Sequence, residues 1–121
     1  MSRYSGLLPR DYNSALRMLN GKRSRKVLNN TVIRTTLSGD AVVEYHGNEI
    51  ARFYANGEVL LTNCGYGTTS TRARLNAMSP ARYGFVQRDY EQMIVDASTG
   101  TETVGGSLYL VPDEFGDLVA A

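Results

Sequence analysis

The chain has 121 residues, enough for one domain with its own core, and its hydrophobic fraction of 42% is typical of a globular protein and excludes a disordered one. No apolar run approaches the ~18 residues that a membrane-spanning helix needs, so we expect no membrane partner. Cys64 is the only cysteine, which excludes an internal disulfide and indicates a reducing compartment. The first residues lack the apolar segment of a secretory signal, and we expect none.

The formal net charge is +1, but the charges are divided unevenly along the chain. Residues 1–28 carry seven basic side chains and one acidic one, whereas residues 89–121 carry seven acidic side chains and no basic one. Opposite charge at the two ends favours contact between them, within one chain or between neighbouring copies. The alternative is two solvated ends that never meet.

Residues 1–28 are predicted to form a short helix followed by a basic arm. Asp11 can cap the start of a stretch with helically spaced apolar residues, and Gly21 can end it. The basic residues that follow show no periodic pattern, so we interpret them as an exposed linker or arm. They are Lys22, Arg23, Arg25 and Lys26.

Residues 29–111 are predicted to form an antiparallel β-rich core. The apolar pattern has a period of two, and turn signals separate four expected strands. The strands are expected at 31–37, 41–46, 49–54 and 58–63. The turns are Ser38-Gly39-Asp40, Gly47-Asn48 and Asn56-Gly57, of which the last is a strong hairpin signal.

A helix is predicted over residues 69–78, with Thr69 or Ser70 as its cap and Ser79-Pro80 at its end. A hairpin around Asp89-Tyr90, a flexible loop over 97–107 and a last strand at 108–111 follow. Residues 112–121 form an acidic tail that either docks on a partner or frays. The predicted fold is therefore α+β: an antiparallel meander with one helix packed on it and a short N-terminal helix.

The stretch GYGTTSTRARLN, residues 65–76, is the candidate binding site. A strand leads into it and a helix leaves it, and the first turn of a helix can hold a phosphate or carboxylate through its unpaired N–H groups. Arginines suit a two-pronged grip on phosphate. The predicted ligand-binding residues are Gly65, Gly67, Thr69, Thr71, Arg72, Arg74 and Asn76.

A structural interpretation of the same stretch competes with the functional one. Two glycines and a run of hydroxyl residues also make a well-capped helix start, with the arginines solvated or paired to the acidic C-terminal tail. The stretch lacks the GK[ST] of a phosphate-binding loop, and Ser70 stands where the third glycine of a dinucleotide fingerprint belongs.

Catalysis has little support in this sequence. Cys64 and His46 would form a nucleophile and base if the fold brought them together. One cysteine and one histidine cannot supply the ligands of a zinc site. We therefore expect no enzyme, no metal and no cofactor.

Nucleic-acid binding is a rival function. The basic arm could neutralise phosphates, and the aromatic residues Tyr45, Phe53, Tyr54 and Tyr66 could stack on bases. The acidic last third of the chain and a pI of 7.9 argue against this function.

Three segments together resemble a family of small proteins of tailed phages and prophages, over residues 25–96. The segments are RKVLNNTVIR, EYHGNEIARFYANGEVLLTNCGYGTTSTRARLN and PARYGFVQRDYEQMIV. They match an N-N-T start, an L-H-x-x-x-I strand, a G-x-V-x-L hairpin and a T-T-x-x-R-I-N helix start. Tyr66 departs from the usual tryptophan and Ser70 from the usual threonine.

The resemblance implies phage origin and expression in the host bacterial cytoplasm, without implying a particular activity. Together with the charges it leads us to expect a non-enzymatic binding protein that forms a homo-oligomer. Its partner would be a host factor or defence component, or it would sequester an anionic, nucleotide-like ligand. The alternatives are a minor virion protein that assembles through its charged ends, and a nucleic-acid-binding protein.

Overall fold

The first helix, α1 (Tyr12–Leu19), begins and ends where the sequence predicts. The Asp11 side chain accepts a hydrogen bond from the Ser14 N–H, and Asn20 ends the helix in the left-handed conformation with φ 50°. In this computed structural model the described residues are 3–121, so the first two residues of the predicted 1–28 segment lie outside them.

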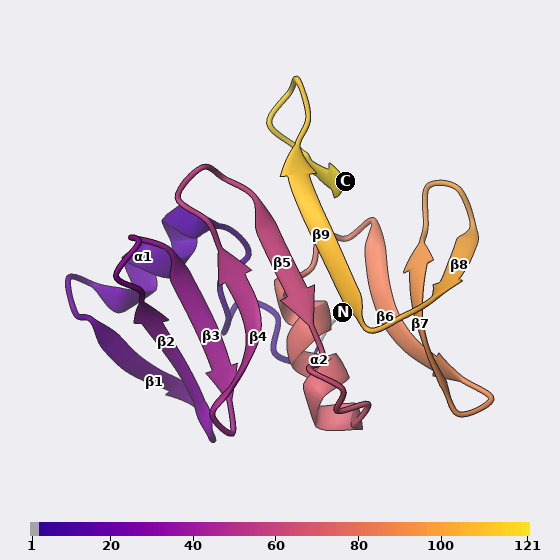
Figure 1. The fold of residues 1–121 in the computed structure, drawn as a ribbon, viewed down its shortest axis with the longest axis horizontal. Coiled ribbons are helices and arrows are strands. Elements are labelled where there is room, and N and C mark those ends of the chain that lie inside the picture. Colours follow the sequence, from indigo (N-terminus) through magenta and orange to yellow (C-terminus); the bar gives the residue numbers. More distant parts are fainter. Residues whose placement is uncertain (1–2) are drawn as a thin grey trace.

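Two antiparallel sheets account for most of the regular secondary structure (Figure 1), which confirms the predicted α+β class. The larger sheet contains, in spatial order, β1 (Ser24–Leu28), β2 (Thr31–Thr35), β3 (Ala41–Tyr45), β4 (Asn48–Phe53), β5 (Val59–Thr62), β9 (Ser107–Pro112) and β10 (Leu118–Ala120). The smaller one contains β6 (Tyr83–Arg88), β7 (Glu91–Asp96) and β8 (Thr101–Val104). Between β5 and β6 lies the second helix, α2 (Thr69–Met78), with the predicted bounds.

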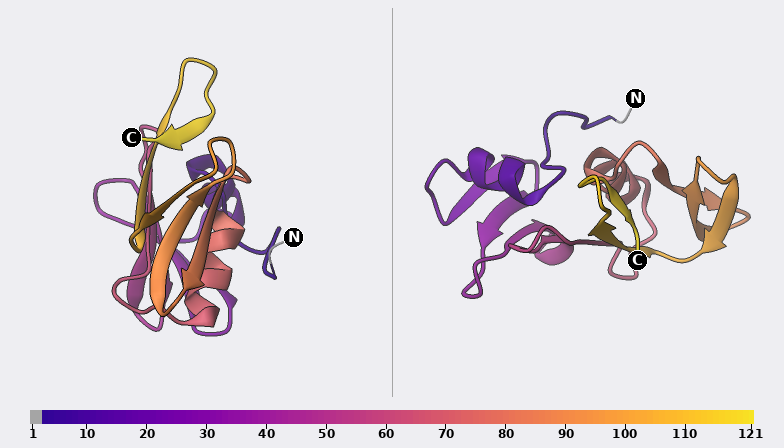
Figure 2. Two further views of the ribbon diagram at one scale, coloured as in Figure 1. Left: turned by 90° about the vertical axis from the view of Figure 1, so that its right-hand side faces the viewer. Right: turned by 90° about the horizontal axis from the view of Figure 1, so that it is seen from above.

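The inner face of the larger sheet forms the core, and both helices lie on this side (Figure 2). Cross-strand register explains the burial, because residues that lie opposite each other on neighbouring strands share a face. One inner row consists of Thr35, Ala41, Phe53, Val59 and Leu110. The last four of these are fully or almost fully buried, so this face supplies the apolar contact for the helices.

The outer face of the same sheet carries a row in which two arginines lie on either side of an apolar residue. Arg34, Val42, Arg52, Leu60 and Tyr109 lie opposite one another across five strands. Val42 is fully buried although it belongs to this outer row, because an arginine lies directly beside it on each neighbouring strand. Long arginine stems cover apolar surface while their charged ends stay near water.

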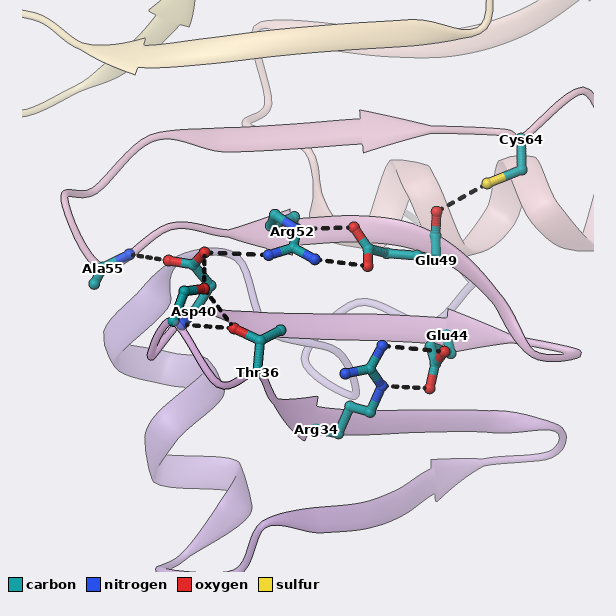
Figure 3. Close-up of polar contacts among 9 residues, drawn as sticks. Arg34, Thr36, Asp40, Glu44, Glu49, Arg52, Ala55 and Cys64 are labelled. Atoms are coloured by element: carbon teal, nitrogen blue, oxygen red, sulfur yellow. Dashed lines mark hydrogen bonds and ion pairs between the residues drawn. The ribbon is translucent and has the colours of Figure 1, made fainter.

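Carboxylates hold these two arginines in place (Figure 3). Arg34 Nε lies 2.8 Å from Glu44 Oε1, and Arg52 lies 2.9 Å from Glu49 and 3.1 Å from Asp40. The outer face is therefore neutralised by ion pairs, which does not favour a nucleic-acid backbone along it.

Tyr109 on this outer face forms a hydrogen bond with Glu58 that can be tested by titration. Its hydroxyl donates to the Glu58 carboxylate, and this hydrogen bond, with burial second, raises the pKa of Tyr109 to about 12. The hydrogen bond therefore gives its full stabilisation at pH values below the ordinary pKa of 10. This stabilisation is lost as the pH rises through the raised pKa of the folded state. We expect Glu58→Gln to move this titration back toward 10 in a tyrosinate absorbance titration, and an unchanged curve would contradict the assignment.

Three strands lie where the sequence interpretation placed irregular segments. β1 occupies most of the expected basic arm, β8 lies in the expected flexible loop, and β10 lies in the acidic tail, which is paired with β9 rather than frayed. Both β1 and β8 are edge strands, where charged and polar side chains are tolerated and blunt the periodic apolar signal.

Two local predictions were wrong by one residue. The β3–β4 turn uses His46-Gly47, both at positive φ (52° and 78°), rather than Gly47-Asn48. Thr68, rather than Thr69 or Ser70, caps α2, because its hydroxyl accepts the Thr71 N–H at 3.2 Å.

Candidate functional site

The start of α2 is fixed by a tight turn after β5. Cys64 and Gly65 both have positive φ, 54° and 81°, and the Asn63 side-chain oxygen accepts the Gly65 N–H at 2.8 Å. Thr68 then caps the helix, and its hydroxyl also donates to that of Thr71 at 2.9 Å. The turn therefore points a hydroxyl-rich helix start at the neighbouring β3–β4 hairpin.

A cavity of about 400 Å³ lies between this helix start and that hairpin. Its lining comes from three segments of the chain: Tyr45, His46, Asn48 and Ile50; Asn63 and Tyr66; Thr68, Ser70 and Thr71. The lining thus combines aromatic rings, amides and hydroxyls with one buried aliphatic side chain. This volume falls within the ~300–1,000 Å³ of typical small-molecule sites.

Three aromatic side chains line the cavity, and two of them are fixed by contacts while the third is open to solvent. The Tyr45 and His46 rings lie 4.3 Å apart, and the Tyr45 hydroxyl donates to the Ser70 hydroxyl at 3.0 Å. Tyr66 is 54% exposed, so its ring is open to solvent as well as to the cavity. The hairpin side of the cavity is therefore preformed, and Tyr66 leaves one side accessible.

Arg74 lies beneath the cavity and is only 3% exposed. Its guanidinium is centred 3.8 Å from the Tyr45 ring and donates to the Ser70 carbonyl at 3.1 Å. Both of these residues also line the cavity. The positive charge is thus separated from the cavity by a single layer of side chain and backbone.

No carboxylate within residues 3–121 pairs with this guanidinium. Its other acceptors are neutral: the Thr31 hydroxyl at 2.8 Å and the Asn29 carbonyl at 3.1 Å, with the Tyr4 ring 4.8 Å away. Four other arginines within residues 3–121 have an acidic partner; these are Arg34, Arg52, Arg82 and Arg88. Arg72, like Arg74, has only neutral hydrogen-bond acceptors, but it is less buried. A buried charge without a counter-charge favours an anion nearby.

Several predicted site residues instead join α2 to the smaller sheet. Arg72 donates to the Gly67 carbonyl at 2.8 Å and to Gln87 and Gln92 at 2.9 and 3.1 Å. A Cβ at Gly67 would lie 2.6 Å from the Gln92 side chain, so this glycine permits close packing. Asn76 bonds both backbone groups of Phe85, at 3.0 and 2.7 Å.

Of the seven predicted residues, Thr71 lines the cavity directly. Gly65 shapes the turn, Thr69 accepts a hydrogen bond from Arg72, and Arg74 lies behind the wall. Sequence reasoning missed the contributions of the hairpin, because nothing in a local pattern brings Tyr45, His46 and Asn48 to the helix start at residues 68–71. The hydroxyl run itself was the signal for Thr68 and Ser70.

Cys64 and His46 make separate contacts. The Cys64 thiol donates to the Glu49 carbonyl at 2.8 Å (Figure 3), and partial burial, with the Glu49 charge second, raises the pKa of this thiol. A raised pKa disfavours the thiolate, which is the nucleophilic form. Over residues 3–121 no cluster of three or more His, Cys, Asp or Glu side chains is placed to hold a metal ion. None of the helices described is long and apolar enough to cross a membrane.

The residues considered for nucleic-acid binding do not form one surface. Lys22, Arg23, Arg25 and Lys26 are exposed on and before β1, at one edge of the larger sheet. Phe53 is fully buried in the core and Tyr54 pairs with Tyr109 on the outer face, at 6.2 Å between ring centroids.

The fold and its cavity define a small α+β protein in which a helix start faces a β-hairpin. The chain belongs to the Kyanoviridae Gp96 protein family, a phage protein family whose model matches residues 10–109. No curated protein and no solved structure matches the chain. The phage origin that the sequence resemblance implied is therefore confirmed.

Proposed function

We propose that this phage protein is a non-enzymatic binding protein that holds a small anionic, nucleotide-like ligand in the cavity at the start of α2. The observation that carries the proposal is the buried Arg74 guanidinium, which has no acidic partner within residues 3–121 and contacts two residues of the cavity wall. An anion in the cavity would supply the missing counter-charge.

The rest of the lining supports the same class of ligand. The first turn of α2 and the hydroxyls of Ser70 and Thr71 suit phosphate oxygens. The rings of Tyr45, His46 and Tyr66 suit a planar base, which stacks on aromatic faces. The proposed setting is the host bacterial cytoplasm, where withdrawing such a ligand would act on a host or defence pathway.

Ligand binding should be visible as thermal stabilisation, because a ligand that binds only the folded state raises its stability. We would measure unfolding with inorganic phosphate and with nucleoside monophosphates at increasing concentration. We expect a rise in Tm with the nucleotides, a smaller one with phosphate, and at least a tenfold loss of nucleotide affinity in Tyr66→Ala. Native mass spectrometry of protein purified from bacteria would report any ligand retained from the cell.

A matched control is available for Tyr66. Tyr90 is 95% exposed in the β6–β7 turn at φ 67°, away from the cavity lining, and asparagine tolerates this backbone conformation. Tyr90→Asn should keep the affinity of the parent protein. No stabilisation by any of these anions, together with a bare mass from bacteria, would overturn the proposal and favour a protein partner.

A further inference from the structure

Most of the charged side chains that form no ion pair within residues 3–121 lie in residues 3–28 or in the last third of the chain; Glu58, Arg72 and Arg74 are the exceptions. All five ion pairs within residues 3–121 use arginines from the middle of the chain. The basic side chains of residues 3–28 are absent from these pairs, and the last third contributes only Asp96 and Glu102. Arg10 and Asp117 both line a cavity of about 590 Å³ beside α1, but no ion pair joins them.

The order of strands explains why the ends do not neutralise each other. The basic strand β1 is at one edge of the larger sheet, and β10, which follows the acidic loop, is at the other edge. Five strands separate these edges, and neighbouring strands lie about 4.8 Å apart. Arg10 lies near the acidic loop within one copy, but the basic side chains on and before β1 can meet that loop only between two copies of the chain.

The acidic partner surface is the tip of the β9–β10 hairpin, residues 113–117, which projects beyond the rest of the chain (Figure 1). The Asp113 side chain accepts the N–H groups of Phe115 and Asp117, at 2.8 and 2.9 Å, so the tip is an ordered turn. Phe115 is 82% exposed, and Glu114 and Asp117 beside it are exposed as well. An exposed aromatic ring flanked by acids has the composition of an interface anchor.

The basic partner surface is the free edge of β1 and the residues just before it. Lys22, Arg23 and Lys26 are exposed, and none of them forms an ion pair in the part of the chain described. Among the residues that the structure describes, no strand pairs with the outer side of β1. Positive charge on an edge strand discourages pairing between two like edges, but it attracts a surface of opposite charge.

We propose that the acidic β9–β10 tip of one copy docks on the basic β1 edge of a second copy. This contact joins two different surfaces, so the first copy keeps a free β1 edge and the second keeps a free acidic tip. The association therefore continues into a ring or an open chain. The contact lies outside the α2 cavity and does not depend on the proposed ligand.

Charge reversal gives a direct test by sedimentation velocity on the full chain. One variant carries Lys22→Glu, Arg23→Glu and Lys26→Glu, and the other carries Glu114→Lys and Asp117→Lys. We expect the parent protein to exceed monomer mass at low salt and to dissociate as salt rises, because exposed charges are screened. Each variant alone should be monomeric, since both of its surfaces then carry the same sign.

An equal mixture of the two variants should associate again, because the unchanged acidic tip of the first fits the unchanged basic edge of the second. Phe115→Ser should weaken the parent association at least tenfold without changing charge, whereas Glu91→Lys, on β7, should leave it within twofold. A parent protein that is monomeric at low salt, or a mixture that stays monomeric, would overturn the proposal. Thermal unfolding near that of the parent, together with unchanged anion binding, would show that the variants are folded and would keep this test separate from that of the cavity.

Discussion

Arg74→Ala is expected to lower the free energy of unfolding by about 3 kcal/mol or more, because it removes a buried cation with hydrogen bonds to three partners and a contact with two aromatic rings. The partners are the Thr31 hydroxyl and the carbonyls of Asn29 and Ser70. For a chain of this size such a loss corresponds to a fall in Tm of roughly 10 °C. Thermal or denaturant unfolding at pH 7 measures it.

Arg72→Ala is the matched control, two positions earlier on the same helix. Arg72 is half-buried and contacts the Gly67 carbonyl and two glutamines, so its loss should cost about 1 kcal/mol. The structural interpretation of the sequence left both arginines solvated or paired to acidic residues, whereas Arg74 is buried and its partners are neutral. Similar small losses for both variants would contradict the structural role of Arg74.

Asp40→Ala is expected to cost about 2–3 kcal/mol, because one carboxylate joins three parts of the larger sheet. Asp40 is 9% exposed, and its oxygens accept the Ala55 N–H at 3.0 Å, the Ser38 hydroxyl at 2.9 Å and the Arg52 guanidinium at 3.1 Å (Figure 3). Without it the Ala55 N–H and Arg52 lose a partner in a partly buried place. Glu44→Ala, which breaks the more exposed pair with Arg34, should cost less than about 1 kcal/mol.

The same carboxylate makes the fold sensitive to acid. The hydrogen bond from the Ala55 N–H, with smaller contributions from Ser38 and Arg52, outweighs burial and holds the pKa of Asp40 below its ordinary 3.8. Because the pKa is lower in the folded state, the ionised carboxylate stabilises the fold at pH values above its unfolded pKa. This stabilisation is lost as the pH falls through the folded pKa. The difference in the free energy of unfolding between the parent and Asp40→Asn should therefore become smaller as the pH is lowered from 7 to 3. A constant gap would indicate that the charge of Asp40 contributes nothing.

Much of the fold could be predicted because local signals and tertiary packing agree. Asp11 and Gly21 bracket α1, the Asn56-Gly57 turn joins β4 and β5, and helix-ending Pro80 follows the last residue of α2 by two positions. The edge strands β1 and β8 could not be predicted, because their charged and polar residues form strands only through a neighbouring strand that supplies the hydrogen bonds.

The sequence predicted where the candidate site lies, but not which residues line it. The helix start was identified from its hydroxyls, whereas the β3–β4 hairpin joins it through packing that no local pattern encodes. The inward position of Arg74 had a signal in the sequence: it lies three residues after Thr71 and next to Leu75, on the face that packs inward. An arginine on an apolar face is a candidate for a buried charge, and this one explains why the helix start would attract an anion.

The most direct test of the central claim is an NMR titration of the backbone amides with a nucleoside monophosphate. We expect saturable shifts that are largest for Asn48, Ser70 and Thr71, around the cavity, with little change in β8. Shifts confined to residues 22–26, or no saturable shifts at all, would contradict a ligand site at the start of α2.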